Sequence, residues 1–181
     1  MIDERIIVAG FGGQGVMMIG KLLAHSGMME NLNVSWLPSY GPEMRGGTAN
    51  CNVILSESII GAPVVTEATC VIAMNLPSLD KFEPSTKVGG RLLINSSLIN
   101  RTSKRSDVQV LEIPVNAIAN AQGSLKVANV VMLGAYIALS QVVKKETVLE
   151  AIEDVLGKSK RHLLDINVKA LEEGMKFANA A

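Results

Sequence analysis

The sequence predicts one α/β domain, spanning residues 1–181, with a mostly parallel sheet that helices cover on both faces. Two observations carry this prediction. Short apolar stretches of strand character alternate with longer helical patterns, and several of the strands read as continuous apolar runs, which is typical of parallel sheets with both faces covered. Apolar residues make up 48% of the chain but aromatic residues only 3%, so an aliphatic core is expected.

The first predicted strand, Arg5–Ala9, runs directly into a glycine-rich turn, and a helical pattern begins at Val16. Strand, glycine turn and helix form the context in which a G-x-G-x-x-G match has a physical meaning. Glycine permits positive φ angles and close backbone approach, and the N–H groups at a helix start favour anions. The turn either serves only strand–helix packing, or it holds a phosphate-bearing ligand through Gly10, Gly12, Gly13, Gln14 and Gly15.

The second predicted strand, Asn33–Pro38, ends without a carboxylate. An NAD site needs Asp or Glu there, about 20 residues after the glycine turn, to hold the ribose hydroxyls. The sequence therefore disfavours a nicotinamide-dependent dehydrogenase.

The stretch that follows, SYGPEMRGGT, concentrates a tyrosine, a glutamate and an arginine between glycines. Glycine and proline alone would make it a surface turn, with a loop-internal ion pair between Glu43 and Arg45. Loops at the carboxyl ends of strands are, however, where open α/β sheets bind ligands. Such a loop buries little apolar area of its own, so its ordering entropy must be offset by something it touches. We expect a subunit-contact or cleft loop made of Tyr40, Gly41, Glu43, Arg45, Gly46, Gly47 and Thr48.

The remaining elements follow from apolar periodicity and from Gly and Pro positions. Strands are predicted at Thr48–Leu55, Cys70–Met74, Arg91–Asn95 and Val108–Ile113, with an interrupted strand-like segment at Ile59–Val65 and a turn at Gly89-Gly90. Helices are predicted from Pro77 to Phe82, from Pro114 to near Gly123, over Val127–Val143, over Glu146–Leu156, and on the face marked by Leu164, Val168, Leu171 and Met175. The helix at 127–143 is apolar on nearly every side, so we expect it to be covered all round, partly by another subunit.

Several classes of function have no support in the sequence. Two cysteines, Cys51 and Cys70, are too few for a zinc or iron–sulfur set, so no metal ligand is assigned. No nucleophile–base pair is present, so no catalytic residue is assigned. The phosphate-binding loop G-x-x-x-x-G-K-[ST] is also absent. Acidic and basic residues balance at 17 each, which gives no reason to expect nucleic acid or a membrane surface. The group Arg101, Lys104 and Arg105 reads as an exposed loop. The acidic N-terminus has no signal-peptide pattern, and buried cysteines suit a reducing cytoplasm.

Four blocks in order, GFGGQGV, SYGPEMRGGTANCNV, VIAMNLPSLDKF and VANVVMLGA, resemble the gamma subunit of 2-oxoacid:ferredoxin oxidoreductases. This family includes the pyruvate, 2-ketoisovalerate and 2-oxoglutarate enzymes, and the resemblance implies a Rossmann-like three-layer domain. It also implies a heteromeric enzyme that decarboxylates a 2-oxoacid oxidatively, passes electrons to ferredoxin and forms an acyl-CoA.

The resemblance implies that this chain positions coenzyme A, whereas thiamine diphosphate and the iron–sulfur clusters lie on partner subunits. The expected partners are alpha and beta subunits, with a ferredoxin-like delta subunit as a further candidate, and the isolated chain should be inactive. The short free-standing chain favours the 2-oxoglutarate type over the pyruvate type. The alternatives are a stand-alone Rossmann-like small-molecule-binding protein or reductase, and the small subunit of indolepyruvate oxidoreductase.

Overall fold

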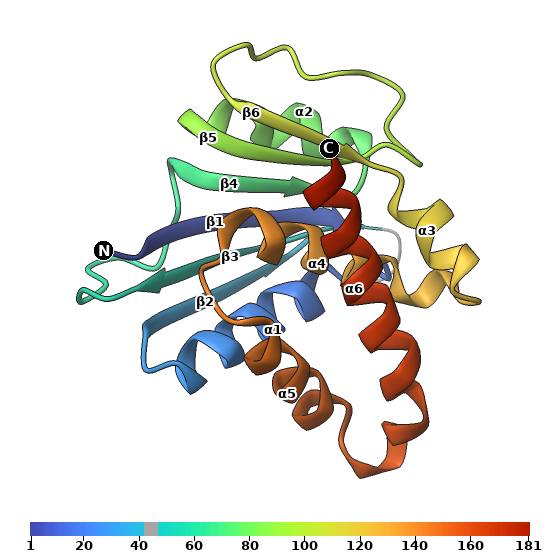
Figure 1. The fold of residues 1–181 in the computed structure, drawn as a ribbon. Helices are drawn as coiled ribbons and strands as arrows, with labels where there is room; N and C mark the ends of the chain where they lie inside the picture. The colour runs from blue at the N-terminus through green and yellow to red at the C-terminus, as the bar shows by residue number, and fades with distance from the viewer. Residues whose placement is uncertain (42–46) are drawn as a thin grey trace.

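The computed structural model describes residues 1–41 and 47–181 and contains a six-stranded sheet in the order β2-β3-β1-β4-β5-β6 (Figure 1). The neighbours β1–β4, β4–β5 and β5–β6 are parallel, whereas β3 runs antiparallel to both β1 and β2. The mostly parallel sheet of the sequence prediction is thus confirmed. The strands are β1 Asp3–Phe11, β2 Asn33–Tyr40, β3 Thr48–Ser56, β4 Ala68–Ala73, β5 Thr86–Asn95 and β6 Gln109–Ile113.

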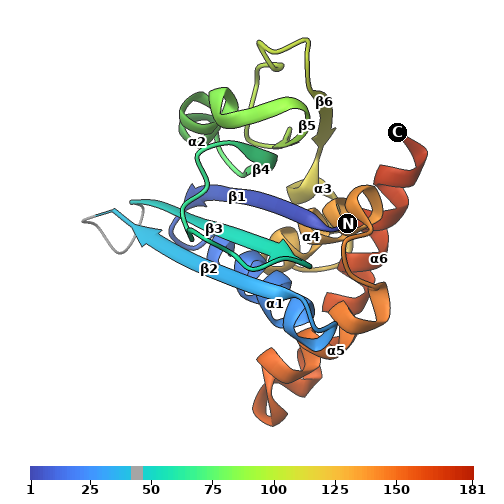
Figure 2. The same cartoon turned by 90° about the vertical axis from the view of Figure 1, so that its left-hand side faces the viewer.

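Helices cover the sheet unequally on its two faces, as the two views show (Figures 1 and 2). One face carries α1, α4 and α6, with α5 packed against α1 and α6, and the other face carries α2. Successive side chains of β1 point to opposite faces of the sheet and so contribute to both apolar clusters. Ile6 and Val8 belong to the larger cluster, and Ile7 and Ala9 belong to the smaller one. The helices are α1 Val16–Met29, α2 Leu76–Phe82, α3 Val115–Ala121, α4 Ala128–Ser140, α5 Lys145–Leu156 and α6 Leu164–Ala180.

Helices α4 and α6 touch through their backbones. A Cβ atom on Gly134 would lie 2.0 Å from the carbonyl oxygen of Leu171, and one on Gly174 would lie 1.9 Å from that of Val131. Residues 128–137 of α4 are all buried within this chain. The apolar helix is therefore covered as expected, and the cover over these residues comes from this chain and not from another subunit.

Three predicted elements differ from the structure. Ile59–Val65 forms no strand; it is part of an irregular segment between β3 and β4. Gly89-Gly90 is not a turn but lies inside β5, where Gly89 has φ of 75° and the register to β4 shifts between Ala68 and Cys70. The ladder between β4 and β5 is irregular at this point, and glycine tolerates the positive φ found there. The fourth helix ends at Ser140, because Gln141 adopts a left-handed conformation with φ of 50°.

Strand β2 does not lie beside β1, because β3 is inserted between them. Its carboxyl end is therefore one strand removed from the glycine turn that follows β1. The parallel neighbour of β1 is β4, and the two residues that follow β4 are Met74 and Asn75.

None of the helices in the described ranges combines the length and the apolar character that a bilayer crossing requires.

Candidate functional site

The glycine turn connects β1 to α1 at the carboxyl edge of the sheet. Gly13 and Gly15 have φ of 97° and 74°, which side chains rarely tolerate, so both positions require glycine. Gly15 occupies the N-cap of α1, and the first helical turn has neither a side-chain cap nor an acidic residue. The positive end of the helix dipole is therefore open.

Only some of the N–H groups in this turn are available to a ligand. The Phe11 N–H donates to Oε1 of Gln14 at 2.7 Å, and the Gln14 N–H donates to the Phe11 carbonyl at 3.1 Å. The Gly12 N–H donates to the Gly47 carbonyl at 3.0 Å. The N–H groups of Gly13, Gly15 and Val16 donate to no protein acceptor within residues 1–41 and 47–181.

The Gln14 side chain ties the turn to the neighbouring strand end. Its Oε1 also accepts from Nδ2 of Asn75 at 3.0 Å, and its Nε2 donates to the Met74 carbonyl at 3.3 Å. Oδ1 of Asn75 in turn accepts from the Ser78 N–H and caps α2. A side chain expected among the ligand-binding groups thus has a structural role that fixes the shape of the turn.

A second carboxamide pair continues this network across β5. Nδ2 of Asn95, a fully buried residue, donates to the Met74 carbonyl at 3.2 Å and to Oδ1 of Asn116 at 3.1 Å. The Asn116 N–H donates to Oγ of Ser97 at 3.2 Å. The ends of β1, β4 and β5 are therefore joined by side-chain amides, which places the glycine turn and α3 at fixed positions.

A cleft of about 560 Å³ opens over the glycine turn. Lys126 is the charged residue among the described residues that line it, and Asn129 approaches the turn so closely that a Cβ on Gly15 would lie 2.5 Å from it. Nδ2 of Asn129 donates to the Gly15 carbonyl at 3.4 Å. A mostly apolar cleft with a few convergent polar groups is the usual form of a small-molecule site. The lining comprises Gly13, Gln14, Gly15, Met18, Met74, Leu98, Asn116, Leu125, Lys126, Ala128 and Asn129.

The structure brings the second predicted stretch to the same edge. Besides the Gly12–Gly47 bond, the Gly41 N–H donates to the Thr48 carbonyl at 2.7 Å, where β2 and β3 join. Tyr40 is 64% exposed. Glu43, Arg45 and Gly46 lie outside the described residues.

Sequence reasoning missed the polar residues Asn75, Asn95, Asn116, Lys126 and Asn129. A signal for two of them was present, because Asn95 ends β5 and Asn75 follows the end of β4 by two residues. Parallel strand ends meet at one edge, so asparagines there are candidates for a shared site. Asn116, Lys126 and Asn129 come from helical segments whose placement over this edge is a tertiary property.

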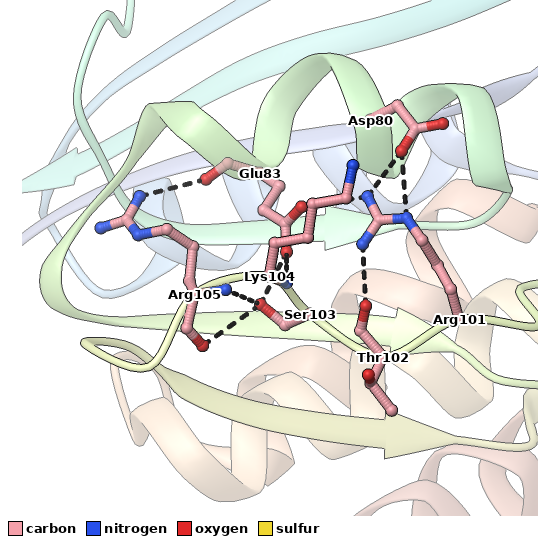
Figure 3. Close-up of polar contacts among 7 residues, drawn as sticks. All are labelled: Asp80, Glu83, Arg101, Thr102, Ser103, Lys104 and Arg105. Carbon is pink, nitrogen blue, oxygen red and sulfur yellow. Dashed lines mark hydrogen bonds and ion pairs between the residues drawn. The ribbon is translucent and has the colours of Figure 1, made fainter.

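The group at 101–105 differs from the expected solvated loop (Figure 3). Glu83, only 4% exposed, accepts hydrogen bonds from Arg101 at 3.0 Å, from Oγ of Ser103 at 2.6 Å and from the Lys104 N–H at 2.7 Å. Burial alone would raise the pKa of Glu83, but these bonds outweigh it and lower the pKa below its ordinary value. The network holds residues 101–105 against the carboxyl-terminal end of α2, whereas Asn75 caps its amino-terminal end.

Both cysteines are fully buried, as the sequence predicted. Burial raises the pKa of Cys51 to about 11 and that of Cys70 further still. Such thiols do not act as nucleophiles near neutral pH. Across the part of the chain that is described, no group of three or more His, Cys, Asp or Glu side chains could hold a metal ion.

Comparison with known proteins gives a consistent set of relatives. Residues 5–177 match the family described as pyruvate ferredoxin/flavodoxin oxidoreductase. The ketoisovalerate oxidoreductase subunit VorA of Methanothermobacter thermautotrophicus is 37% identical over 97% of this chain, but this chain spans only 36% of that relative's length. The 2-oxoglutarate synthase subunit KorC of Methanocaldococcus jannaschii is 33% identical, over 97% of this chain and 94% of its own length.

Two solved structures resemble the fold closely. The gamma subunit of a keto/oxoacid ferredoxin oxidoreductase from Geobacter sulfurreducens has a TM-score of 0.84 and 31% identity, over 98% of this chain and 99% of its own. The 2-oxoglutarate:ferredoxin oxidoreductase of Magnetococcus marinus, with 2-oxoglutarate, coenzyme A and succinyl-CoA bound, has a TM-score of 0.92, covering all of this chain and 32% of its own. At 24% identity, the second likeness concerns the fold alone.

Proposed function

The chain belongs to the pyruvate ferredoxin/flavodoxin oxidoreductase family, and from this premise we propose that it serves as the gamma subunit of a 2-oxoacid:ferredoxin oxidoreductase and holds part of coenzyme A. One observation carries the second half of the proposal. The N–H groups of Gly13, Gly15 and Val16, which bind no acceptor within residues 1–41 and 47–181, belong to the turn that, with Lys126, borders one cleft. N–H groups at a helix start together with a lysine suit a phosphate or pyrophosphate.

The fit of coenzyme A to the cleft is partial. A volume of about 560 Å³ is typical of sites for small ligands. We propose that the phosphate end enters the cleft and that the thiol end extends toward a partner subunit. When bound, coenzyme A supplies the thiol that receives the acyl group; this chain's residues would bind the anionic end and orient it.

The experiment compares Lys126→Ala with Lys87→Ala in the assembled complex. Lys87 is exposed near the amino end of β5, outside the cleft lining, so it is a matched control. Loss of a charge-assisted bond of about 1.5–3 kcal/mol should raise the KM for coenzyme A by about tenfold or more, with the KM for the 2-oxoacid unchanged. An unchanged KM for coenzyme A in Lys126→Ala would remove the cleft from the binding site.

The thiamine diphosphate and the iron–sulfur clusters are assigned, in this proposal, to alpha, beta or delta partner subunits. For the iron–sulfur clusters the support is chemical, because both thiols of this chain are buried and protonated. The purified chain alone should therefore be colourless and should not reduce ferredoxin or viologen with a 2-oxoacid, thiamine diphosphate and coenzyme A. Activity of the chain alone would contradict this assignment and would support a stand-alone reductase.

For the substrate we propose 2-oxoglutarate, with 2-ketoisovalerate as the second candidate. The first rests on the likeness to the KorC relative, which is 33% identical and matched over 94% of its length. The second rests on the higher identity to VorA, at 37%. The kcat/KM of the assembled complex with each 2-oxoacid, and with indolepyruvate, decides between them.

We further propose that the Tyr40–Thr48 loop contacts a partner subunit. The exposed ring of Tyr40 supports this, because it projects at the edge where β2 ends. Tyr40→Ala should fold normally but weaken assembly with the partner subunits in size-exclusion chromatography. Normal assembly with lost turnover would instead assign the loop to the active-site cleft.

A single domain over residues 1–181 also remains a proposal. Both apolar clusters pack against the same sheet, which supports cooperative unfolding. Calorimetry of the chain should show one transition whose calorimetric and van't Hoff enthalpies agree.

A further inference from the structure

A second cavity lies next to the proposed coenzyme A cleft and has a different character. It is bordered by α1, the start of α4, α5, α6 and the 3₁₀ segment Lys158–Leu163, and has a volume of about 200 Å³. Its walls are largely aliphatic, with Leu22, Val130, Ile152, Val155, Leu163 and Ile166 among them.

This cavity is partly open to solvent, because Met18 and Leu163 in its wall are exposed. Its size and aliphatic lining suit a small apolar group. An apolar engineered cavity of about 150 Å³ stays dry and binds benzene, so the present volume can accept an apolar group somewhat larger than a benzene ring. An apolar group bound there would remove part of the aliphatic wall from contact with water.

The lining of the cavity adds a positive charge to this apolar space. Lys126 and Lys160 both line it, and no acidic side chain is among the lining residues of the described chain. No ion pair found in residues 1–41 and 47–181 involves either ammonium group. The chain as a whole has a formal net charge of zero, so this local excess of positive charge is not a consequence of its composition.

We propose that this cavity binds a small carboxylate with an apolar tail, a medium-chain aliphatic or arylalkanoic acid. The tail would lie between α5 and α6, and the carboxylate would pair with Lys126 and Lys160. The site is distinct from that of coenzyme A, although Met18, Lys126 and Asn129 line both spaces. Because Lys126 borders both spaces, the test of this site relies on Lys160, which lines this cavity and not the coenzyme A cleft.

The test uses octanoate as the probe, with the full chain and with the assembled complex, by isothermal titration calorimetry. Octanoate should bind saturably at one site, and octan-1-ol, which lacks the carboxylate, should bind about tenfold more weakly or worse. Lys160→Gln should weaken octanoate binding about tenfold, whereas Lys158→Gln should leave it unchanged, because Lys158 is also exposed but does not line the cavity.

Val155→Phe places a ring in the cavity and should abolish octanoate binding while the variant still unfolds cooperatively. Should that variant fail to fold, the two lysine variants carry the test, since both side chains are exposed and neither is needed for packing. The proposal is overturned by absence of saturable octanoate binding to the wild-type chain, or by binding that Lys160→Gln does not weaken. Binding to the free chain but not to the complex also overturns it, because a partner segment would then occupy the cavity.

Discussion

The Gly12 N–H donates a hydrogen bond of 3.0 Å to the carbonyl oxygen of Gly47, and this bond links the two motif-bearing stretches of the chain. Gly12 lies in the turn after β1, and Gly47 immediately precedes β3. The antiparallel pairing of β1 with β3, which ends at Phe11 and Thr48, brings them together. The glycine turn is therefore supported from one side by Gly47 and from the other by Gln14 and Asn75.

Removal of the Gln14 side chain should loosen the glycine turn. Gln14→Ala takes the acceptor from the partly buried Phe11 N–H, and an unpaired buried donor costs about 1–3 kcal/mol. We expect a loss of that size in the free energy of unfolding, measured by urea titration, and a raised KM for coenzyme A in the complex. Asn120→Ala, an exposed substitution on α3, is the control. Unchanged stability in Gln14→Ala would show that water replaces the acceptor.

The contact between α4 and α6 should tolerate no side chain at Gly174. In Gly174→Ala the added methyl group would meet the Val131 carbonyl at 1.9 Å, so the two helices must separate. Overpacking typically lowers the free energy of unfolding by about 1–3 kcal/mol. Because the conflict here is with a backbone atom, which cannot rotate away, we expect Gly174→Ala to lose about 3 kcal/mol or more. Gly61→Ala, where a Cβ meets nothing within 4 Å, should stay within about 0.5 kcal/mol of the original protein. Equal stability of the two variants in urea would refute the close approach.

The two carboxylates that bind Arg101 should contribute very differently to stability. Glu83 is buried and also accepts from Ser103 and Lys104, so Glu83→Ala should cost about 3 kcal/mol. The side chain of Asp80 is 52% exposed, and Asp80→Ala should cost less than about 1 kcal/mol. Chemical denaturation of both variants measures the difference. A larger loss in Asp80→Ala than in Glu83→Ala would contradict this ranking.

Acid should destabilise the protein partly through Glu83. Its pKa is lowered on folding, so its contribution is fully present above the ordinary glutamate pKa of about 4.3 and is lost as the pH falls through the folded-state value. The free energy of unfolding should therefore fall less steeply in Glu83→Gln than in the original protein between about pH 6 and about pH 3. Parallel pH profiles for the two proteins would mean that other carboxylates dominate the acid response.

Both thiols should be inert in the native protein. With a pKa of about 11, Cys51 has only about one thiolate in a thousand molecules at a pH of about 8, and it is fully buried in addition. We expect no reaction with 5,5′-dithiobis(2-nitrobenzoate) until the chain unfolds, when both cysteines should react. Rapid labelling of the native chain would show that the packing around Cys51 or Cys70 opens.

The sequence by itself determined the type of most elements, because local chemistry decides them. Apolar periodicity marks the helices, Gly157 follows the last residue of α5, and Pro77 lies in the first turn of α2. The glycine turn and its open helix start follow from a single continuous stretch. The four motif blocks likewise identified the family without any knowledge of the fold.

The tertiary structure alone decided how these parts meet. The insertion of β3 between β1 and β2 cannot be read from local pattern, since strand order depends on which edges pair across long loops. The Ile59–Val65 segment has strand-like residues but no partner strand, and it remains irregular. Glu83 and Arg101 look like ordinary surface charges until α2 and the 101–105 segment are brought into contact. Asn129 reaches Gly15 only because α4 packs over the turn, and such contacts depend on packing free energy summed over the whole domain.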